Sequence, residues 1–351
     1  MTTKFIGTTF PLNQQYGRDE LSVVDSTRQQ IAAAFPDGNN LIINTTWFGP
    51  QFDNGLWDQL QMLIQQKQSF DNLFFIIVID PIYISDEQIS MIESAFGTKT
   101  TYFMGHRKDS PWYYNFEAWV LDKHSNYLLD QLALKSPDHV FLCYQRKPRS
   151  HRVILAQELV AQGLHTRGIL TLGDNNDGYD WSEGRSMPAI KLDEDINNIN
   201  PPVNEAFGIV NDLGSLGNLD RWQRHFLNIV SETEINNWHP LFVSEKTFKP
   251  LLGLRPFVIF GQTEVYKFLK KHGFKTFSQY WKHIPIEDGE DQLGNVVQVV
   301  KFLCEQSSAE LTSMYNDMLP DLIYNRQMFF DFAKKQEYTI AHLFDQCHKD
   351  T

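Results

Sequence analysis

Cysteines and long apolar runs are both scarce in this chain. Its 351 residues include only three cysteines, Cys143, Cys304 and Cys347, an odd number spaced too widely for a zinc site or a disulfide framework. The longest uninterrupted apolar run, Leu73 to Ile79, has seven residues, whereas a membrane-spanning helix needs about 20. We therefore expect a cytoplasmic protein that does not enter a membrane.

Positive charge is also in short supply. The chain has 31 Lys and Arg against 43 Asp and Glu, so its net charge is -12. This balance argues against wholesale coating of nucleic acid, although it leaves room for a local basic patch. No low-complexity tract and no internal repeat are present. With 42% apolar and 13% aromatic residues, the sequence predicts a globular protein long enough for two domains.

Short apolar runs alternate with helical patterns along the chain. In the first part, four such runs predict strands: Asn40 to Asn44, Leu73 to Ile79, Thr101 to Met104 and Val140 to Tyr144. A run that is apolar at every position is typical of a parallel strand buried on both faces. Later segments predict further strands at Gly168 to Leu172, Phe226 to Ser231 and Pro256 to Phe260, and helices at Arg152 to Gln162, Glu245 to Leu252 and Thr263 to Lys271. This alternation predicts an α/β protein with two Rossmann-like domains.

The polar, proline-containing segment from Leu134 to His139 marks the predicted domain boundary. We expect an N-terminal domain over residues 1–135 and a C-terminal domain over residues 136–308. From Ala309 onward the pattern is mostly helical, including Tyr324 to Ala333 and Thr339 to Cys347. We therefore expect residues 309–351 to form a helical tail that folds back toward the N-terminal domain.

The segment from Phe242 to Gly261, FVSEKTFKPLLGLRPFVIFG, is the most informative one. Ser244 is a suitable cap for a helix whose first turn holds Glu245 and Lys246. Helix starts at the carboxyl ends of parallel strands bind phosphates and riboses. Lys246 is then a candidate ligand of a diphosphate, and Glu245 of a ribose diol. The alternative is an ordinary amphipathic helix with a solvated Glu-Lys pair.

Linked motifs strengthen the first interpretation. Glu245 to Pro250 reads EKTFKP, Arg255 to Phe257 reads RPF, Gly273 to Phe277 reads GFKTF, and Asn228 to Thr233 precedes them as NIVSET. Residues 139–285 therefore resemble the GT-B glycosyltransferases of the fucosyltransferase type and, more closely, the glycosyltransferase-like proteins of large bacteriophages.

The resemblance implies transfer of a sugar from a nucleotide-diphosphate sugar to an acceptor hydroxyl. It also implies that Ser244, Glu245, Lys246 and Thr247 bind the donor. The acceptor is either a glycan or, as the phage-type resemblance suggests, a hydroxylated base in DNA. A non-catalytic protein that binds nucleotides or glycans is the alternative from a different class, because a fold does not fix a function.

A basic loop follows the predicted strand Val140 to Tyr144. It carries Arg146, Lys147, Arg149 and Arg152 into the start of the next helix, where the helix dipole is also positive. The resemblance implies that an arginine here contacts the donor phosphates, with Arg146 and Arg152 as the matching candidates. The alternatives are a solvated basic loop and a patch for the backbone phosphates of DNA.

The reaction also needs a general base, because the acceptor hydroxyl must lose its proton. Asp80 directly follows the strand Leu73 to Ile79 and is one candidate; Glu117 and Asp109 are its rivals. A carboxylate at the end of a strand is often only a loop cap.

We expect no metal and no other cofactor. Asp193-Glu194-Asp195 has the spacing of an Asp-x-Asp metal site, but such a polar acidic run is usually solvated. The histidines form no HExxH pair. Lys246 and Arg146 are then expected to neutralise the leaving diphosphate.

Overall fold

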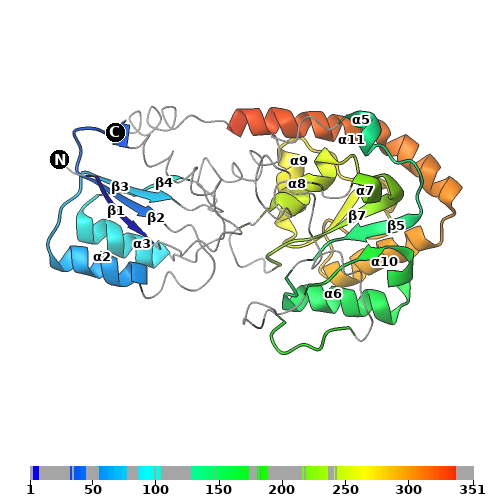
Figure 1. The fold of residues 1–351 in the computed structure, drawn as a ribbon, viewed down its shortest axis with the longest axis horizontal. Coiled ribbons are helices and arrows are strands. Elements are labelled where there is room, and N and C mark those ends of the chain that lie inside the picture. Colours follow the sequence, from blue (N-terminus) through cyan, green and yellow to red (C-terminus); the bar gives the residue numbers. More distant parts are fainter. Residues whose placement is uncertain are drawn as a thin grey trace. The chain divides into compact units, whose positions relative to one another are not determined.

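The structure is a computed structural model that describes a large part of the chain. The described residues are 3–7, 32–33, 35–44, 55–76, 86–98, 100–103, 128–145, 147–173, 180, 182–188, 216, 219–235, 241 and 243–336. They form a mixed α/β protein with two parallel sheets, in two compact units (Figure 1). No helix in these ranges combines the length and the apolar character that crossing a membrane requires.

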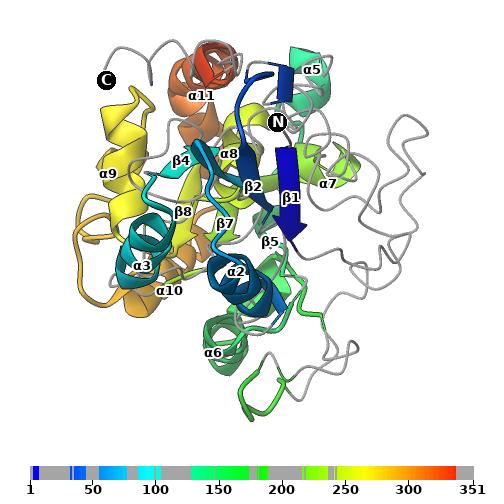
Figure 2. The ribbon, with the colours of Figure 1, turned by 90° about the vertical axis from the view of Figure 1, so that its left-hand side faces the viewer.

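The first unit is built on a four-stranded sheet with the strand order β1-β2-β3-β4. Its strands are β1 (Thr3–Gly7), β2 (Asn40–Asn44), β3 (Asn72–Ile76) and β4 (Thr100–Phe103). Helices α2 (Gly55–Gln65) and α3 (Asp86–Phe96) cover the same face of this sheet (Figures 1 and 2). Between sheet and helices lies a buried cluster made of Ile6, Leu41, Ile43, Leu60, Leu63, Phe70, Leu73, Ile92 and Phe96.

The second unit holds another four-stranded parallel sheet, with the strand order β6-β5-β7-β8. Its strands are β5 (His139–Cys143), β6 (Ile169–Leu170), β7 (His225–Ser231) and β8 (Phe257–Phe260). All seven residues of β7 are buried, as expected for a central strand covered on both faces.

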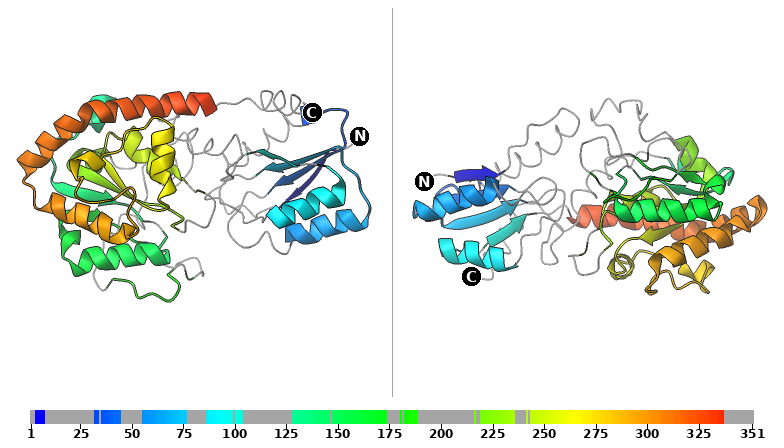
Figure 3. Two further views of the ribbon diagram at one scale, coloured as in Figure 1. Left: turned by 180° about the vertical axis from the view of Figure 1, so that it is seen from behind. Right: turned by 90° about the horizontal axis from the view of Figure 1, so that it is seen from below.

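Helices cover both faces of this second sheet (Figures 1 and 3). On one face lie α6 (Ser150–Ala161) and α10 (Gln292–Cys304). On the other lie α8 (Glu245–Leu252), α9 (Glu264–Lys271) and α11 (Ser308–Gln336). Phe248 of α8 packs against Phe329 and Phe332 of α11, with ring centroids 5.8 and 6.0 Å apart.

The strand order creates a switch point between β5 and β7. After β5 the chain forms α6 and reaches β6 on one side of the sheet, whereas after β7 it forms α8 and reaches β8 on the other side. Ligands of open α/β sheets bind outside the carboxyl ends of the strands at such a point. The carboxyl ends of β5 and β7 are therefore the expected place for a ligand site.

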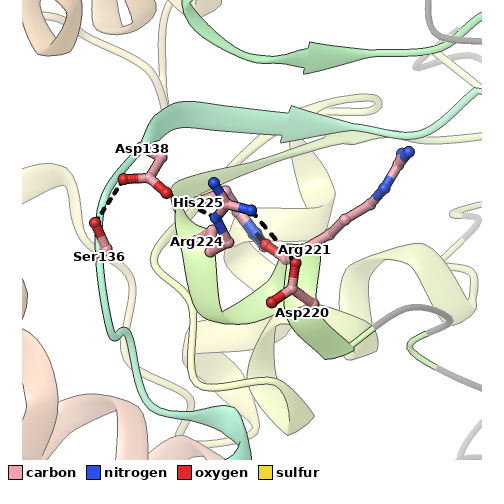
Figure 4. A network of polar contacts seen from close by, with 6 residues as sticks. All are labelled: Ser136, Asp138, Asp220, Arg221, Arg224 and His225. Atoms are coloured by element: carbon pink, nitrogen blue, oxygen red, sulfur yellow. Dashed lines mark hydrogen bonds and ion pairs between the residues drawn. The ribbon is translucent and has the colours of Figure 1, made fainter.

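Polar contacts also connect elements at the opposite edge of this sheet, where its strands begin (Figure 4). Helix α7 (Leu219–Arg224) leads directly into β7. Arg224 Nε donates to Asp138 Oδ2 at 2.7 Å, directly before β5. His225 Nδ1 donates to the carbonyl oxygen of Arg221 at 2.9 Å. The first contact fastens the start of β7 to the start of β5, and the second joins α7 to β7.

Most of the predicted elements are confirmed in the described residues. The strand Asn40 to Asn44 and the helix Glu245 to Leu252 have the predicted bounds. The helix expected over Tyr324 to Ala333 is part of the longer α11. Thr339 to Cys347, the rest of the predicted tail, lies outside the described residues.

Candidate functional site

Two helices begin at the carboxyl edge of the second sheet, beside the switch point. Helix α6 starts at Ser150 and α8 at Glu245. His151 and Arg152 in the first turn of α6 contact the backbone at the end of β7. The cap of α8 contacts the residue directly after β7, which is Glu232. Both helix starts therefore meet at Glu232.

The Glu232 side chain is completely buried and fully hydrogen-bonded. Its Oε1 accepts from Ser244 N at 3.1 Å and from Thr247 Oγ1 at 2.5 Å. Its Oε2 accepts from Ser244 Oγ at 2.5 Å and from Thr233 N at 3.2 Å. A buried carboxylate is tolerable only when its oxygens are paired in this way. Glu232 thus accepts hydrogen bonds from the start of α8 that water would otherwise accept.

Ser244 is the N-cap of α8, as its sequence position predicts. Its hydroxyl donates to Glu232 and accepts from Lys246 N at 3.3 Å and from Lys246 Nζ at 3.4 Å. One donor and two acceptor positions exhaust what a hydroxyl offers. Lys246 remains partly exposed, and it is the cationic residue in the first turn of α8.

Arg152 is almost entirely buried and points into the protein. Its Nη1 donates to the carbonyl oxygen of Lys147 at 3.2 Å. Its Nη2 donates to the carbonyl oxygens of Ser231 and Glu232, both at 3.2 Å. The guanidinium therefore ties α6 to the end of β7 while its charge remains beside the carboxyl edge of the sheet.

His151 is buried in the first turn of α6, beside several cations. Burial, together with the nearby charges of Arg152, Arg149 and Lys246, lowers its pKa to about 3. Its Nε2 lies 2.9 Å from the carbonyl oxygen of Glu232, and because a carbonyl only accepts, Nε2 carries the proton. His151 is neutral at physiological pH and holds a single tautomer.

Cys143 at the end of β5 has no reactive character. It is buried, and burial raises the pKa of its thiol to about 12, so no thiolate forms at neutral pH. The neighbouring Gln145 extends β5, donating its N–H to Thr171 Oγ1 at 3.1 Å and accepting from Gly173 N at 2.9 Å. Nucleophilic catalysis by Cys143 does not fit this site.

The predicted site residues separate into distinct groups. Ser244 and Thr247, expected at the donor, instead bind Glu232 with their hydroxyls, and Arg152 binds carbonyl oxygens. Among the predicted donor-binding residues whose side chains the structure describes, Lys246 combines a place at a helix start with partial exposure; Arg149, the N-cap of α6, is partly exposed as well.

The side chains of the remaining predicted site residues lie outside the described part of the structure. Glu245 is the first residue of α8, and its backbone alone is described. Asp80, Glu117 and Arg146 lie outside the described residues, as do Asp109 and the acidic run at 193–195. Within the described ranges, no three His, Cys, Asp or Glu side chains come together in a way that fits a metal ion.

Glu232 is the residue that the sequence reasoning left without a role. A signal exists, because a charged residue directly follows a strand that is buried throughout. A carboxylate at that position must either reach solvent or find donors nearby, and here it finds them on α8.

Comparison with known proteins identifies no relative: no protein-family model, no curated protein and no solved structure matches this chain.

Proposed function

We propose that this protein is a glycosyltransferase of GT-B architecture, which moves a sugar from a nucleotide-diphosphate sugar to an acceptor hydroxyl. The observation that carries this proposal is the convergence of two helix starts and two cationic side chains at the switch point of the second sheet. The motifs around Glu245-Lys246 support the same conclusion from the sequence.

The local charge balance fits a diphosphate. Each helix start contributes about half a positive charge, and Arg149, Arg152 and Lys246 add cations, against the negative charges of Glu232 and Glu245. The balance is positive, as binding of an anionic diphosphate requires. In a protein whose net charge is -12, such a local surplus favours an anionic ligand.

The reaction assigns separate roles to these residues. Lys246 stabilises the diphosphate as the bond between its oxygen and the anomeric carbon breaks, and the leaving oxygen keeps the electron pair. The acceptor oxygen bonds to the same carbon and gives its proton to a carboxylate, for which Asp80, Glu117 and Asp109 are the candidates. Glu245 is proposed to bind the ribose and Arg146 the phosphates. No metal or other cofactor is part of this proposal.

Incubation with UDP, GDP and TDP sugars tests the proposal. We expect one nucleotide sugar to raise the melting temperature and to release its nucleoside diphosphate when an acceptor is present. Glycans and DNA with hydroxylated bases, supplied separately, distinguish the two acceptor classes. A nucleotide sugar that binds but is never cleaved with either acceptor would contradict the enzymatic proposal and favour a non-catalytic binding protein.

A further inference from the structure

Glu232 accepts hydrogen bonds from the starts of both α6 and α8. Its carboxylate accepts hydrogen bonds from Ser244 and Thr247 at the start of α8. Its carbonyl oxygen accepts from His151 and Arg152 at the start of α6. The two helices follow different strands and lie on opposite faces of the sheet, so this residue fixes the distance between their first turns.

The surroundings leave Glu232 little freedom to move. The side chain is fully buried, and its two oxygens accept four hydrogen bonds. Gly261, directly after β8, faces it so closely that a Cβ at this glycine would lie 2.9 Å from Glu232 Cβ. The geometry of the edge is therefore set before any ligand arrives.

We infer that Glu232 is a positioning residue for anion binding, which aligns the first turn of α8 with that of α6 so that Lys246 and the helix start face the same anion. This inference rests on the proposed function, in which the anion is the diphosphate of the donor. Glu232 itself touches no ligand, because it is buried and its oxygens are paired.

The charge of Glu232 and its position predict opposite effects of Glu232→Gln on anion affinity. By charge alone, the carboxylate repels an anion, so Glu232→Gln should strengthen anion binding. By position, the variant should weaken it. A glutamine oxygen can still accept from Ser244 N and Thr247 Oγ1, but its NH2 group cannot accept the hydrogen bonds that Oε2 receives from Ser244 Oγ and Thr233 N.

The experiment is calorimetric titration of the full chain with inorganic pyrophosphate. We expect Glu232→Gln to raise the dissociation constant at least about tenfold, or about 1.4 kcal/mol, because a displaced first turn of α8 no longer presents Lys246 to the anion. Hydrogen exchange of the amides at 244–247 should also become faster. An unchanged or lower dissociation constant in Glu232→Gln would overturn the inference.

Glu287→Gln is the matched control. Glu287 is also a buried carboxylate of the second unit, but it binds Lys270 in the last turn of α9 and makes no contact with Glu232. A merely structural role predicts lower melting temperatures for both variants and no change in pyrophosphate binding for either. Equal weakening of pyrophosphate binding in both variants would count against a specific role of Glu232.

Thr247→Val keeps the inference testable if Glu232→Gln does not fold. It removes one hydrogen bond to Glu232 with little change of shape, and we expect a rise of roughly three- to tenfold in the dissociation constant. Pyrophosphate bound by Thr247→Val as tightly as by the wild type would overturn the inference.

Failure of the inference and failure of the proposed function give different results. A wild type that cleaves a nucleotide sugar, with Glu232→Gln binding pyrophosphate normally, would remove the positioning role alone. A wild type that binds pyrophosphate, with weaker binding in Glu232→Gln, but that cleaves no nucleotide sugar would remove the transferase alone. A wild type that binds no pyrophosphate would contradict both.

Discussion

Side chains of similar polarity behave differently at the carboxyl edge of the second sheet. Ser244, Thr247 and Arg152 are buried and direct their polar groups to protein partners, whereas Lys246, whose ammonium also donates to Ser244 Oγ, is only partly buried. A buried donor or acceptor must be paired within the protein, and a partly exposed ammonium can bind a ligand as well. Ligand binding at this edge should therefore depend most directly on Lys246.

Lys246→Ala should weaken binding of pyrophosphate or a nucleoside diphosphate by about 1.5–3 kcal/mol, because a charge-assisted hydrogen bond is lost. Calorimetry on the folded variant measures this loss. Arg224→Gln is the matched control, since it removes one positive charge at the opposite edge of the same sheet, where Arg224 pairs with Asp138 (Figure 4). Similar affinity losses in both variants would point to a general charge effect and contradict a site at Lys246.

His151 should make the protein sensitive to acid. Burial and the neighbouring cations lower its pKa from 6.5 to about 3 in the folded state, whereas in the unfolded chain it returns to the ordinary value. Between these values the unfolded state binds more protons, so the free energy of unfolding falls as the pH falls below about 6.5.

Urea denaturation of His151→Gln between pH 4 and pH 7 checks this expectation. In the variant, the slope of the free energy of unfolding against pH should be smaller than in the wild type, by up to about 1.4 kcal/mol per pH unit. His225, whose pKa burial and Arg255 also hold well below its ordinary value, remains in the variant, so a smaller pH dependence persists. Identical pH dependence in the wild type and His151→Gln would show that His151 is not buried as a neutral ring.

At the scale of helices and strands, the sequence predicts best where the signal is local. The cap, charged first turn and following glycine of α8 give its bounds, and the apolar runs of β5 and β7 give these strands to within one residue. The chain segments of β1, α2, α3 and α10 were not predicted. β1 contains only Phe5 and Ile6 as large apolar residues, and it forms because every residue pairs with β2.

Helix α10 illustrates how packing overrides local preference. It contains Val296, Val297, Val299 and Val300, residues whose branching at Cβ disfavours a helix, yet all four are buried in it. The candidate site is likewise not determined by local sequence. Nothing local to Glu232 shows that its carboxylate turns to Ser244, 12 residues later, and not to solvent. Contacts between distant elements decide both cases.

The close approach of β8 to β7 gives a prediction at this scale. Gly261→Ala places a Cβ 2.9 Å from Glu232 Cβ, so we expect it to destabilise the protein by about 1–3 kcal/mol and to weaken pyrophosphate binding by displacing Glu232. Thermal unfolding and calorimetry measure the two effects.

Gly253→Ala provides the comparison for Gly261→Ala. A Cβ at Gly253 would clash with the Trp222 ring, a contact that does not involve Glu232. We expect a loss of stability without a change in pyrophosphate affinity. If Gly261→Ala also leaves the affinity unchanged, Glu232 does not need its present position for anion binding.

At the scale of the whole molecule, the chain divides into two compact units, each with its own parallel sheet and buried core. In the second unit, Arg255 lies at the edge of the sheet where the strands begin. Its side chain is fully buried. Its Nη1 donates to the carbonyl oxygens of Leu132 at 2.8 Å and Leu254 at 2.7 Å, and its Nη2 donates to the carbonyl oxygen of Trp222. These carbonyls precede β5, β8 and β7, so one guanidinium joins the entries of three strands.

Burial lowers the pKa of Arg255 to about 10, which still leaves it charged at neutral pH. Tyr315 of α11 completes its surroundings, with its hydroxyl 3.3 Å from Nη1. Arg255→Met would fill a similar space but leave several buried carbonyl oxygens without donors, and each such group costs about 1–3 kcal/mol. We therefore expect a large loss of stability that is confined to the second unit.

Differential scanning calorimetry combined with hydrogen exchange checks this last expectation. In Arg255→Met, amides of β5, β7 and β8 should exchange much faster, while those of β2 and β3 keep their wild-type rates, because the first unit has its own core. Pyrophosphate affinity below the lowered melting temperature should stay unchanged, since Arg255 lies at the edge of the sheet opposite Glu232. Equal loss of protection in both units would show that they unfold as one cooperative block, and Arg255 would then stabilise the whole chain.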